Sequence, residues 1–148
     1  ANPHKSAQIV WNKLNQNAAA NGALMRTAVL GCYQFNQIDK VIQNTLEMCR
    51  VTHHDSRCQA SCVLADTIIS YLLQNPQDSY SDQDIDALVK KGLEHALPLL
   101  EPKHNEEFMK HIVKDSSEES LYSLKLDEKD KIGYTLKCLG SAIWGLRS

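Results

Sequence analysis

Residues 20–26, Ala-Asn-Gly-Ala-Leu-Met-Arg, combine residue types that suit the binding of an anion. An Asn-Gly turn here opens directly into a helical pattern. The first N–H groups of a helix lack partners within the helix and lie at the positive end of its dipole, so a phosphate can accept hydrogen bonds from them. Arg26 adds a positive charge one turn later. The alternative is an ordinary turn, with Arg26 in a structural ion pair.

Residues 52–58, Thr-His-His-Asp-Ser-Arg-Cys, form a second polar segment, between two helical patterns. An imidazole at a helix–helix junction can donate a hydrogen bond to a hydroxyl or a phosphate. Asp55 or Ser56 is suited to cap the helix that follows. The alternative is that His53 and His54 only cap or fill the junction.

Other chemistries are less well supported. His54, Cys58 and Cys62 suggest zinc, but His54 and Cys62 would be ~12 Å apart along one helix, whereas zinc ligands lie only ~2.0–2.3 Å from the metal. A nucleophilic pair of Cys49 with His53 has no supporting signature. The sequence has no P-loop, dinucleotide-binding fingerprint or nucleophile elbow.

A calcium loop is suggested by three alternating acids, but its pattern is incomplete. The Gly required at the sixth position is Ala87, and the Glu required at the twelfth is Leu93. The acids are better explained as favourable charges at a helix N-terminus. They are Asp82, Asp84 and Asp86.

Composition predicts one ordinary globular domain. The chain has 148 residues, of which 43% are hydrophobic and 23% charged. The net charge of −2 argues against a nucleic-acid binder. No apolar run approaches the ~18 residues of a membrane span, and no secretory h-region is visible. The five scattered cysteines argue against a disulfide framework, so we expect a cytoplasmic protein.

Helical periodicity positions these segments. Apolar residues recur at helical spacing along most of the chain, and no segment alternates like a strand. The stripe through Cys58, Cys62, Ala65, Ile69 and Leu72 predicts a central, buried helix. We therefore expect a single all-α domain of about seven helices over residues 1–148, with a polar linker at 115–120. The helices are expected at about 3–15, 23–33, 38–50, 56–74, 82–97, 108–113 and 129–146.

Together these patterns resemble the ADP-ribosyl glycohydrolase family, which includes the dinitrogenase-reductase-activating glycohydrolases and crystallin relatives. Residues 21–26 are close to the family's N-G-[SA]-x-M-R signature. Thr52-His53 resembles its T-H junction, and residues 133–144 resemble its G-Y-x-[LF]…A-x-W helix. Order and spacing agree over nearly the whole chain, and the first motif is the most specific.

This resemblance implies an all-α fold that removes ADP-ribose from modified proteins or related conjugates. It implies that Asn21, Gly22, Ala23 and Met25 line the phosphate and distal-ribose side of the substrate. It also implies that His53 contacts ADP-ribose. The expected partner is then ADP-ribose or an ADP-ribosylated protein.

The metal ligands of the family are missing from the pattern. Family members bind Mg²⁺ through acidic motifs that resemble G-D-x-x-G with T-D-D, and D-T-D, and none of these strings occurs here. The nearest, Ala65-Asp66-Thr67, lacks the second Asp. We expect a central portion of a larger domain, with Mg²⁺ as a cofactor of the complete enzyme only. No catalytic residue or metal ligand is assigned to this chain, which is expected to be inactive alone.

Three functions remain open at this stage. The chain is a hydrolase fragment, a non-catalytic ADP-ribose-binding or crystallin-like structural relative, or an unrelated helical interaction domain. If it is truncated, apolar helix faces near Trp11, Trp144 and Leu146 should be exposed and favour self-association.

Overall fold

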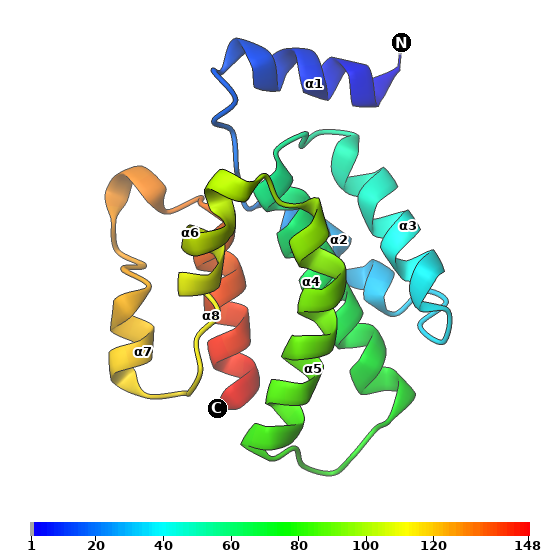
Figure 1. Ribbon diagram of the computed structural model, residues 1–148, viewed down its shortest axis with the longest axis vertical. Coiled ribbons are helices and arrows are strands. Elements are labelled where there is room, and N and C mark those ends of the chain that lie inside the picture. Colours follow the sequence, from blue (N-terminus) through cyan, green and yellow to red (C-terminus); the bar gives the residue numbers. More distant parts are fainter. Residues whose placement is uncertain (1) are drawn as a thin grey trace.

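The computed structural model describes residues 2–148, and the chain there is helical (Figure 1). Over this range the only extended pairing is an isolated bridge between Ala20 and Tyr134. The predicted all-α class is confirmed, with eight α-helices in place of about seven. They are α1 (Pro3–Lys13), α2 (Gly22–Thr27), α3 (Ile38–Arg50), α4 (Ser56–Gln74), α5 (Asp82–Ala96), α6 (Asn105–Lys110), α7 (Glu118–Ser123) and α8 (Thr135–Arg147).

Short polar side chains begin three of the helices where the sequence predicted them. The Asn2 side chain accepts a hydrogen bond from the backbone of Lys5, and Pro3 occupies the first turn of α1. Asp55 caps α4. Ser81 and Asp84 form a capping box at the start of α5, in which each side chain bonds the backbone of the other residue.

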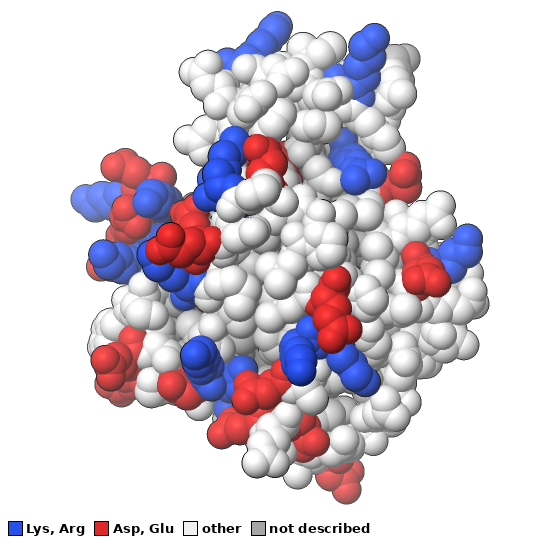
Figure 2. Space-filling model, in the orientation of Figure 1, with Lys and Arg blue, Asp and Glu red and all other residues white. Residues whose placement is uncertain are grey.

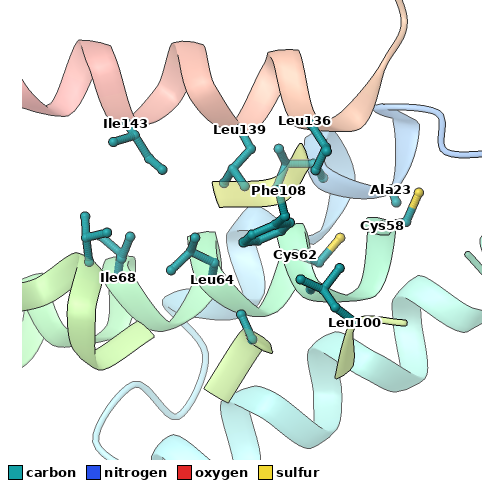
Figure 3. Packing of buried hydrophobic residues seen from close by; sticks show 14 of the residues in the cluster. Ala23, Cys58, Cys62, Leu64, Ile68, Leu100, Phe108, Leu136, Leu139 and Ile143 are labelled. Atoms are coloured by element: carbon teal, nitrogen blue, oxygen red, sulfur yellow. The ribbon is translucent and has the colours of Figure 1, made fainter. Parts of the chain in front are cut away.

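Helix α4 lies at the centre and packs against α2, α3, α5 and α8. Figure 3 shows apolar side chains of α8 directed towards those of α4, with Phe108 of α6 beside them. Phe108 and Leu64 are completely buried, and Leu136 is as well. Burial of such side chains contributes about 1.5–3 kcal/mol each, so α4 is held in place from several sides.

Two glycines allow neighbouring segments to approach α4 closely. A Cβ at Gly31 would lie 2.7 Å from the carbonyl oxygen of Asp66 and 2.8 Å from Cβ of Ile69. A Cβ at Gly92 of α5 would lie 2.6 Å from Cδ1 of Leu64. Both contacts are too short for any side chain, so the packing of α4 depends on glycine at these positions.

The apolar stripe predicted to be buried on α4 is only partly so. Cys58 and Cys62 are fully buried, but Ala65, Ile69 and Leu72 are half-buried. These last three line one wall of an apolar groove of about 150 Å³, and α8 forms the other wall. Because α4 is surrounded on several sides, its polar residues are buried as well, and burial extends beyond the apolar stripe.

Two expected boundaries are wrong, one for a local reason and one because of long-range hydrogen bonds. The predicted linker at 115–120 contains the start of α7, because Ser117 caps that helix by accepting from the backbone of Ser120. The last helix begins at Thr135 and not near Lys129, because residues 131–134 leave the helix to bond the loop before α2. Ile132, which falls inside the helix expected from about residue 129, is 65% exposed as a result.

The chain ends also differ from expectation. Trp11 and Trp144 were expected to be exposed apolar sites. Each is half-buried and donates a hydrogen bond, Trp11 to Asp55 and Trp144 to the carbonyl of Ser117. Among the described residues, none of the helices has both the length and the apolarity that crossing a membrane requires.

Candidate ligand-binding site

Three segments that are far apart in the sequence meet beside the start of α4. They are the loop before α2, the junction between α3 and α4, and the turn before α8. The Asn21 N–H donates to the Gly133 carbonyl at 2.7 Å, and the Thr135 N–H donates to the Ala19 carbonyl at 3.0 Å. The Cys58 thiol donates to the Ala20 carbonyl. These bonds join the two predicted polar segments to the Gly-Tyr turn.

His53 lies directly beside Gly22. A Cβ at Gly22 would be 3.7 Å from Cε1 and 3.9 Å from Nε2 of the imidazole. The other ring nitrogen, Nδ1, shares a hydrogen bond of 2.6 Å with the hydroxyl of Thr52. Thr52 therefore orients the ring so that its Nε2 edge is on the side of Gly22.

His53 is neutral at pH 7. Burial lowers the pKa of its imidazole below 6.5, the positive charge of Arg26 lowers it further, and the negative charge of Asp55 partly opposes both. A neutral imidazole has one donor and one acceptor nitrogen. It can therefore hydrogen-bond a hydroxyl or a phosphate without carrying a charge itself.

Arg26 has a structural role in this arrangement. Its guanidinium donates to the backbone carbonyls of Met48 at 2.6 Å and of Cys49 at 3.4 Å, in the last turn of α3. The last carbonyls of a helix lack partners within it and attract a cation. The Cys49 carbonyl also accepts from the backbone N–H groups of Thr52 and His53, which follow the helix. The structural alternative for Arg26 is therefore the better explanation, although its partners are carbonyls and not an acid.

The other predicted residues of the turn differ in what they present to a ligand. Asn21 is half-buried, and its side-chain oxygen lies 3.9 Å from where a Cβ at Gly133 would be. Met25 is 69% exposed. Ala23 is completely buried, so its methyl group packs in the core and only its backbone can face a ligand. Contact of these residues with a ligand remains a prediction.

A buried ion pair at the same junction was not predicted from the sequence. Arg57 donates from Nε and Nη2 to the two carboxylate oxygens of Asp55, at 2.9 and 2.8 Å. Trp11 donates from its indole N–H to Asp55 at 3.0 Å. Burial by itself would raise the pKa of Asp55, but the hydrogen bonds from Arg57 and Trp11 outweigh it and lower that pKa.

Arg57 links this pair to a pocket of about 510 Å³. Its guanidinium donates to the Tyr134 hydroxyl at 3.3 Å and to the Asn17 side chain at 3.1 Å, and it lies over the Tyr134 ring. Burial raises the pKa of Tyr134, so its phenol stays protonated. The residues that line the pocket are Asn17, Ala19, Arg57, Glu107, Asp130, Lys131, Gly133 and Tyr134.

The lining of this pocket suits a neutral polar group. It presents two carboxylates, Glu107 and Asp130, and two cations, of which Arg57 is paired with Asp55 and Lys131 lies 3.6 Å from Glu128. Tyr134 adds an aromatic face. Donors and acceptors side by side can satisfy the hydroxyl groups of a sugar, which both donate and accept. The Gly-Tyr match in the sequence pointed to Tyr134, but no pattern pointed to Arg57.

The metal-binding alternatives find no support in the side-chain geometry. Within residues 2–148, no group of three His, Cys, Asp or Glu side chains lies close enough to hold a metal ion. Among the acids of α5, Asp84 belongs to the capping box and Asp86 pairs with Arg147. The Cys49 thiol donates to the backbone carbonyl of His53 and not to its ring, so the proposed nucleophilic pair is not formed.

Comparison with known proteins gives one result. A family model described as ADP-ribosylglycohydrolase matches residues 1–148, the whole of the chain. No curated protein and no solved structure matches it.

Proposed function

Because the chain belongs to the ADP-ribosylglycohydrolase family, we propose that the site beside α4 binds the ADP-ribose part of a modified protein or a related conjugate. The phosphates lie against the backbone of Asn21 and Gly22, and His53 donates to them or to the adjacent ribose. Ala23 contributes through its backbone, and Met25 lies at the rim.

The approach of His53 to Gly22 carries this proposal. The absence of a side chain at Gly22 leaves its backbone open to a ligand, and the imidazole edge lies only 3.7 Å from the Cβ position. A group at this point can contact the peptide backbone and the ring together. Because His53 is neutral at pH 7, it contributes a directed hydrogen bond and no charge.

The 510 Å³ pocket would receive a hydroxyl-rich part of the same ligand. It adjoins the turn, because Gly133 lines the pocket and also accepts a hydrogen bond from Asn21. Arg57 and Tyr134 supply oriented donors, and the two carboxylates accept from hydroxyl groups. A ribose has the size and the mixed hydrogen-bonding character that this lining requires.

The family is generally metal-dependent, and Mg²⁺ would supply activation of water for cleavage of the glycosidic bond. The residues described here do not fit that ion, because hard cations need several oxygen ligands and no three acidic or other ligating side chains converge among them. We assign no step of the reaction to a metal on these residues. Their part in the proposal is to bind and orient ADP-ribose.

Calorimetric titration with ADP-ribose tests the proposed site. His53→Ala should weaken binding by about 1–3 kcal/mol, as expected for loss of one buried or charged hydrogen bond. The matched control is His95→Ala, which removes an imidazole that bonds Tyr71 at 2.8 Å between α4 and α5. Equal affinities for wild type and His53→Ala would leave only a structural role for this histidine.

A second assay separates binding from catalysis. We expect the isolated chain to release no ADP-ribose from an ADP-ribosylated protein in the presence of Mg²⁺, since it assembles no metal ligands. Release that depends on Mg²⁺ and is abolished by a chelator would contradict this expectation. Binding without release would support the non-catalytic alternative for residues 1–148.

We also propose a cytoplasmic setting and self-association. All five cysteines are free thiols, as expected in a reducing compartment. Exposed apolar side chains lie on α1 and directly after it, where Ile9, Val10 and Leu14 are 47%, 55% and 52% exposed. Sedimentation at micromolar concentration should show dimers or larger species, and a clean monomer would contradict self-association.

A further inference from the structure

Asp55 lies in the chain between His53 and the pocket residue Arg57, to which it is paired. We propose that Asp55 is a positioning residue, which holds Arg57 and, through it, Tyr134 in the pocket. This inference rests on the proposed function, because it assigns the residue that orients the ADP-ribose site. It concerns a carboxylate that is buried and does not line the pocket itself.

The geometry around Asp55 leaves its carboxylate little freedom. The side chain is 1% exposed. Both of its oxygens accept from the guanidinium of Arg57, Oδ1 also accepts from the Arg57 N–H, and Oδ2 accepts from the indole of Trp11. Bidentate pairing of this kind fixes the plane of the guanidinium as well as its position.

The orientation of Arg57 is passed on to the pocket. With Nε and Nη2 held by Asp55, the remaining N–H groups reach the Tyr134 hydroxyl from Nη1 and the side-chain amide oxygen of Asn17 from Nη2. Tyr134 and Asn17 lie 77 and 40 positions away from Arg57 in the sequence. Asp55 accepts the two shortest hydrogen bonds of the guanidinium, and it therefore contributes most to holding that angle.

Helix α1 is attached to the site through the same carboxylate. Figure 1 shows α1 lying apart from the helices around α4. Trp11 joins it to the junction by its hydrogen bond to Asp55 and by the contact of its ring with His54, with the ring centres 5.1 Å apart. The remaining polar contact of the helix is distant, from His4 to Glu47 of α3. Asp55 therefore also links Trp11 of α1 to Arg57, which in turn donates to the side chain of Asn17.

His53 is influenced by the same carboxylate. Among the groups around its ring, Arg26 of α2 lowers its pKa and Asp55 raises it, while Cys49 of α3 contacts its carbonyl and Thr52 its Nδ1. Removal of the charge of Asp55 leaves Arg26 unopposed. A purely structural role for Asp55 would affect folding but would not change the titration of His53.

The test is Asp55→Asn, studied by ADP-ribose calorimetry and by NMR titration of the His53 ring protons. We expect binding about tenfold weaker, because a charged hydrogen-bond network is lost, and a lower pKa for His53. The control is Asp86→Asn, which removes the carboxylate partner of Arg147 at the far end of α8 (2.6 Å). It should change neither affinity nor the titration.

A second variant covers the case in which Asp55→Asn fails to fold. Trp11→Phe keeps an aromatic ring but removes the indole N–H that bonds Asp55, and it should weaken ADP-ribose binding by about threefold. An unchanged His53 titration in folded Asp55→Asn would overturn the inference, and so would an unchanged affinity in Trp11→Phe. If wild type binds no ADP-ribose, the proposed function fails, while the titration still tests the role of Asp55 at His53.

Discussion

The start and the middle of the central helix differ in how they hold a buried aspartate. Asp55, at the start of α4, is paired with Arg57 and bonded by Trp11, and its pKa is lowered. Asp66, in the middle of α4, is 0% exposed and accepts one hydrogen bond, of 2.6 Å, from Thr45. Its other oxygen has no partner among the described residues. Burial raises the pKa of Asp66 to about 7, although the bond from Thr45 opposes this.

The difference shows that hydrogen-bond and ionic partners, and not depth of burial, decide whether the pKa of a buried acid is lowered or raised. The surroundings of the two acids also differ in how open they are. Gly22 and His53 leave the Asp55 end open to a ligand, whereas Gly31 lies tightly against the backbone of Asp66. At the start of α4, Asp55 carries a charge in an oriented network. In the middle of α4, Asp66 has a raised pKa that favours its protonated form below about pH 7, and it takes no part in the site.

The largest expected loss of stability follows from breaking the ion pair of Asp55 with Arg57. Arg57→Met should lower the free energy of unfolding by about 3–5 kcal/mol, because Asp55 would be left buried without a counter-charge. Urea denaturation measures this loss. Lys103→Met, which removes an exposed pair with Glu101, should cost less than about 1 kcal/mol. Similar costs for both variants would contradict the comparison.

A pH-dependent effect on the free energy of unfolding is expected at Asp66. The pKa of Asp66 is about 7 in the folded chain and near 3.8 when unfolded, so the folded state binds the proton more tightly. The stabilisation that protonated Asp66 contributes to the folded state is complete below pH 4, and it is lost as pH rises to about 7. Asp66→Asn should therefore raise the free energy of unfolding at pH 8, by at most about 4 kcal/mol, and not at pH 4.

Urea denaturation at several pH values tests this expectation. The control is Asp78→Asn, which changes an exposed acid in the loop between α4 and α5 and should leave the pH dependence of wild type intact. If the free energy of unfolding of Asp66→Asn falls between pH 4 and 7 as steeply as that of wild type, the pH dependence of stability comes from other groups.

A smaller loss of stability is expected when Gly31 is replaced. Gly31→Ala should destabilise the chain by about 1–3 kcal/mol, because the added methyl would lie 2.7 Å from the carbonyl oxygen of Asp66 and the core would have to shift. Thermal or urea denaturation measures the loss. A neutral result would mean that the segment from Ala28 to Gly31 moves away from α4 easily.

The smallest expected effect on stability is at Gly22. Gly22→Ala places a methyl 3.7 Å from the His53 ring, an ordinary contact, so the free energy of unfolding should change by less than about 0.5 kcal/mol. ADP-ribose binding should nevertheless weaken, because the methyl occupies the space proposed for the ligand. Unchanged binding by calorimetry would show that the ligand does not contact this turn.

Much of the fold was predictable because helices follow local patterns. Asn2, Asp55 and the pair of Ser81 with Asp84 begin helices where their residue types predicted it. The last helix was predicted too early, because the turn at Gly133 is held by hydrogen bonds to the loop before α2. Such long-range pairing leaves no periodic trace in either segment.

The candidate site divides in the same way. The sequence by itself determined the all-α class, the helix caps, and the two polar segments with Gly22 and His53, because these depend on neighbours a few residues away and on a family signature. Only the tertiary structure decided that Arg57 reaches Tyr134 and that Ala23 is buried in the core. It also decided that Asp66 lacks a second partner while Asp55 has several. The physical reason is that hydrogen bonds and burial in a packed interior join residues dozens of positions apart, and local patterns do not record which ones meet.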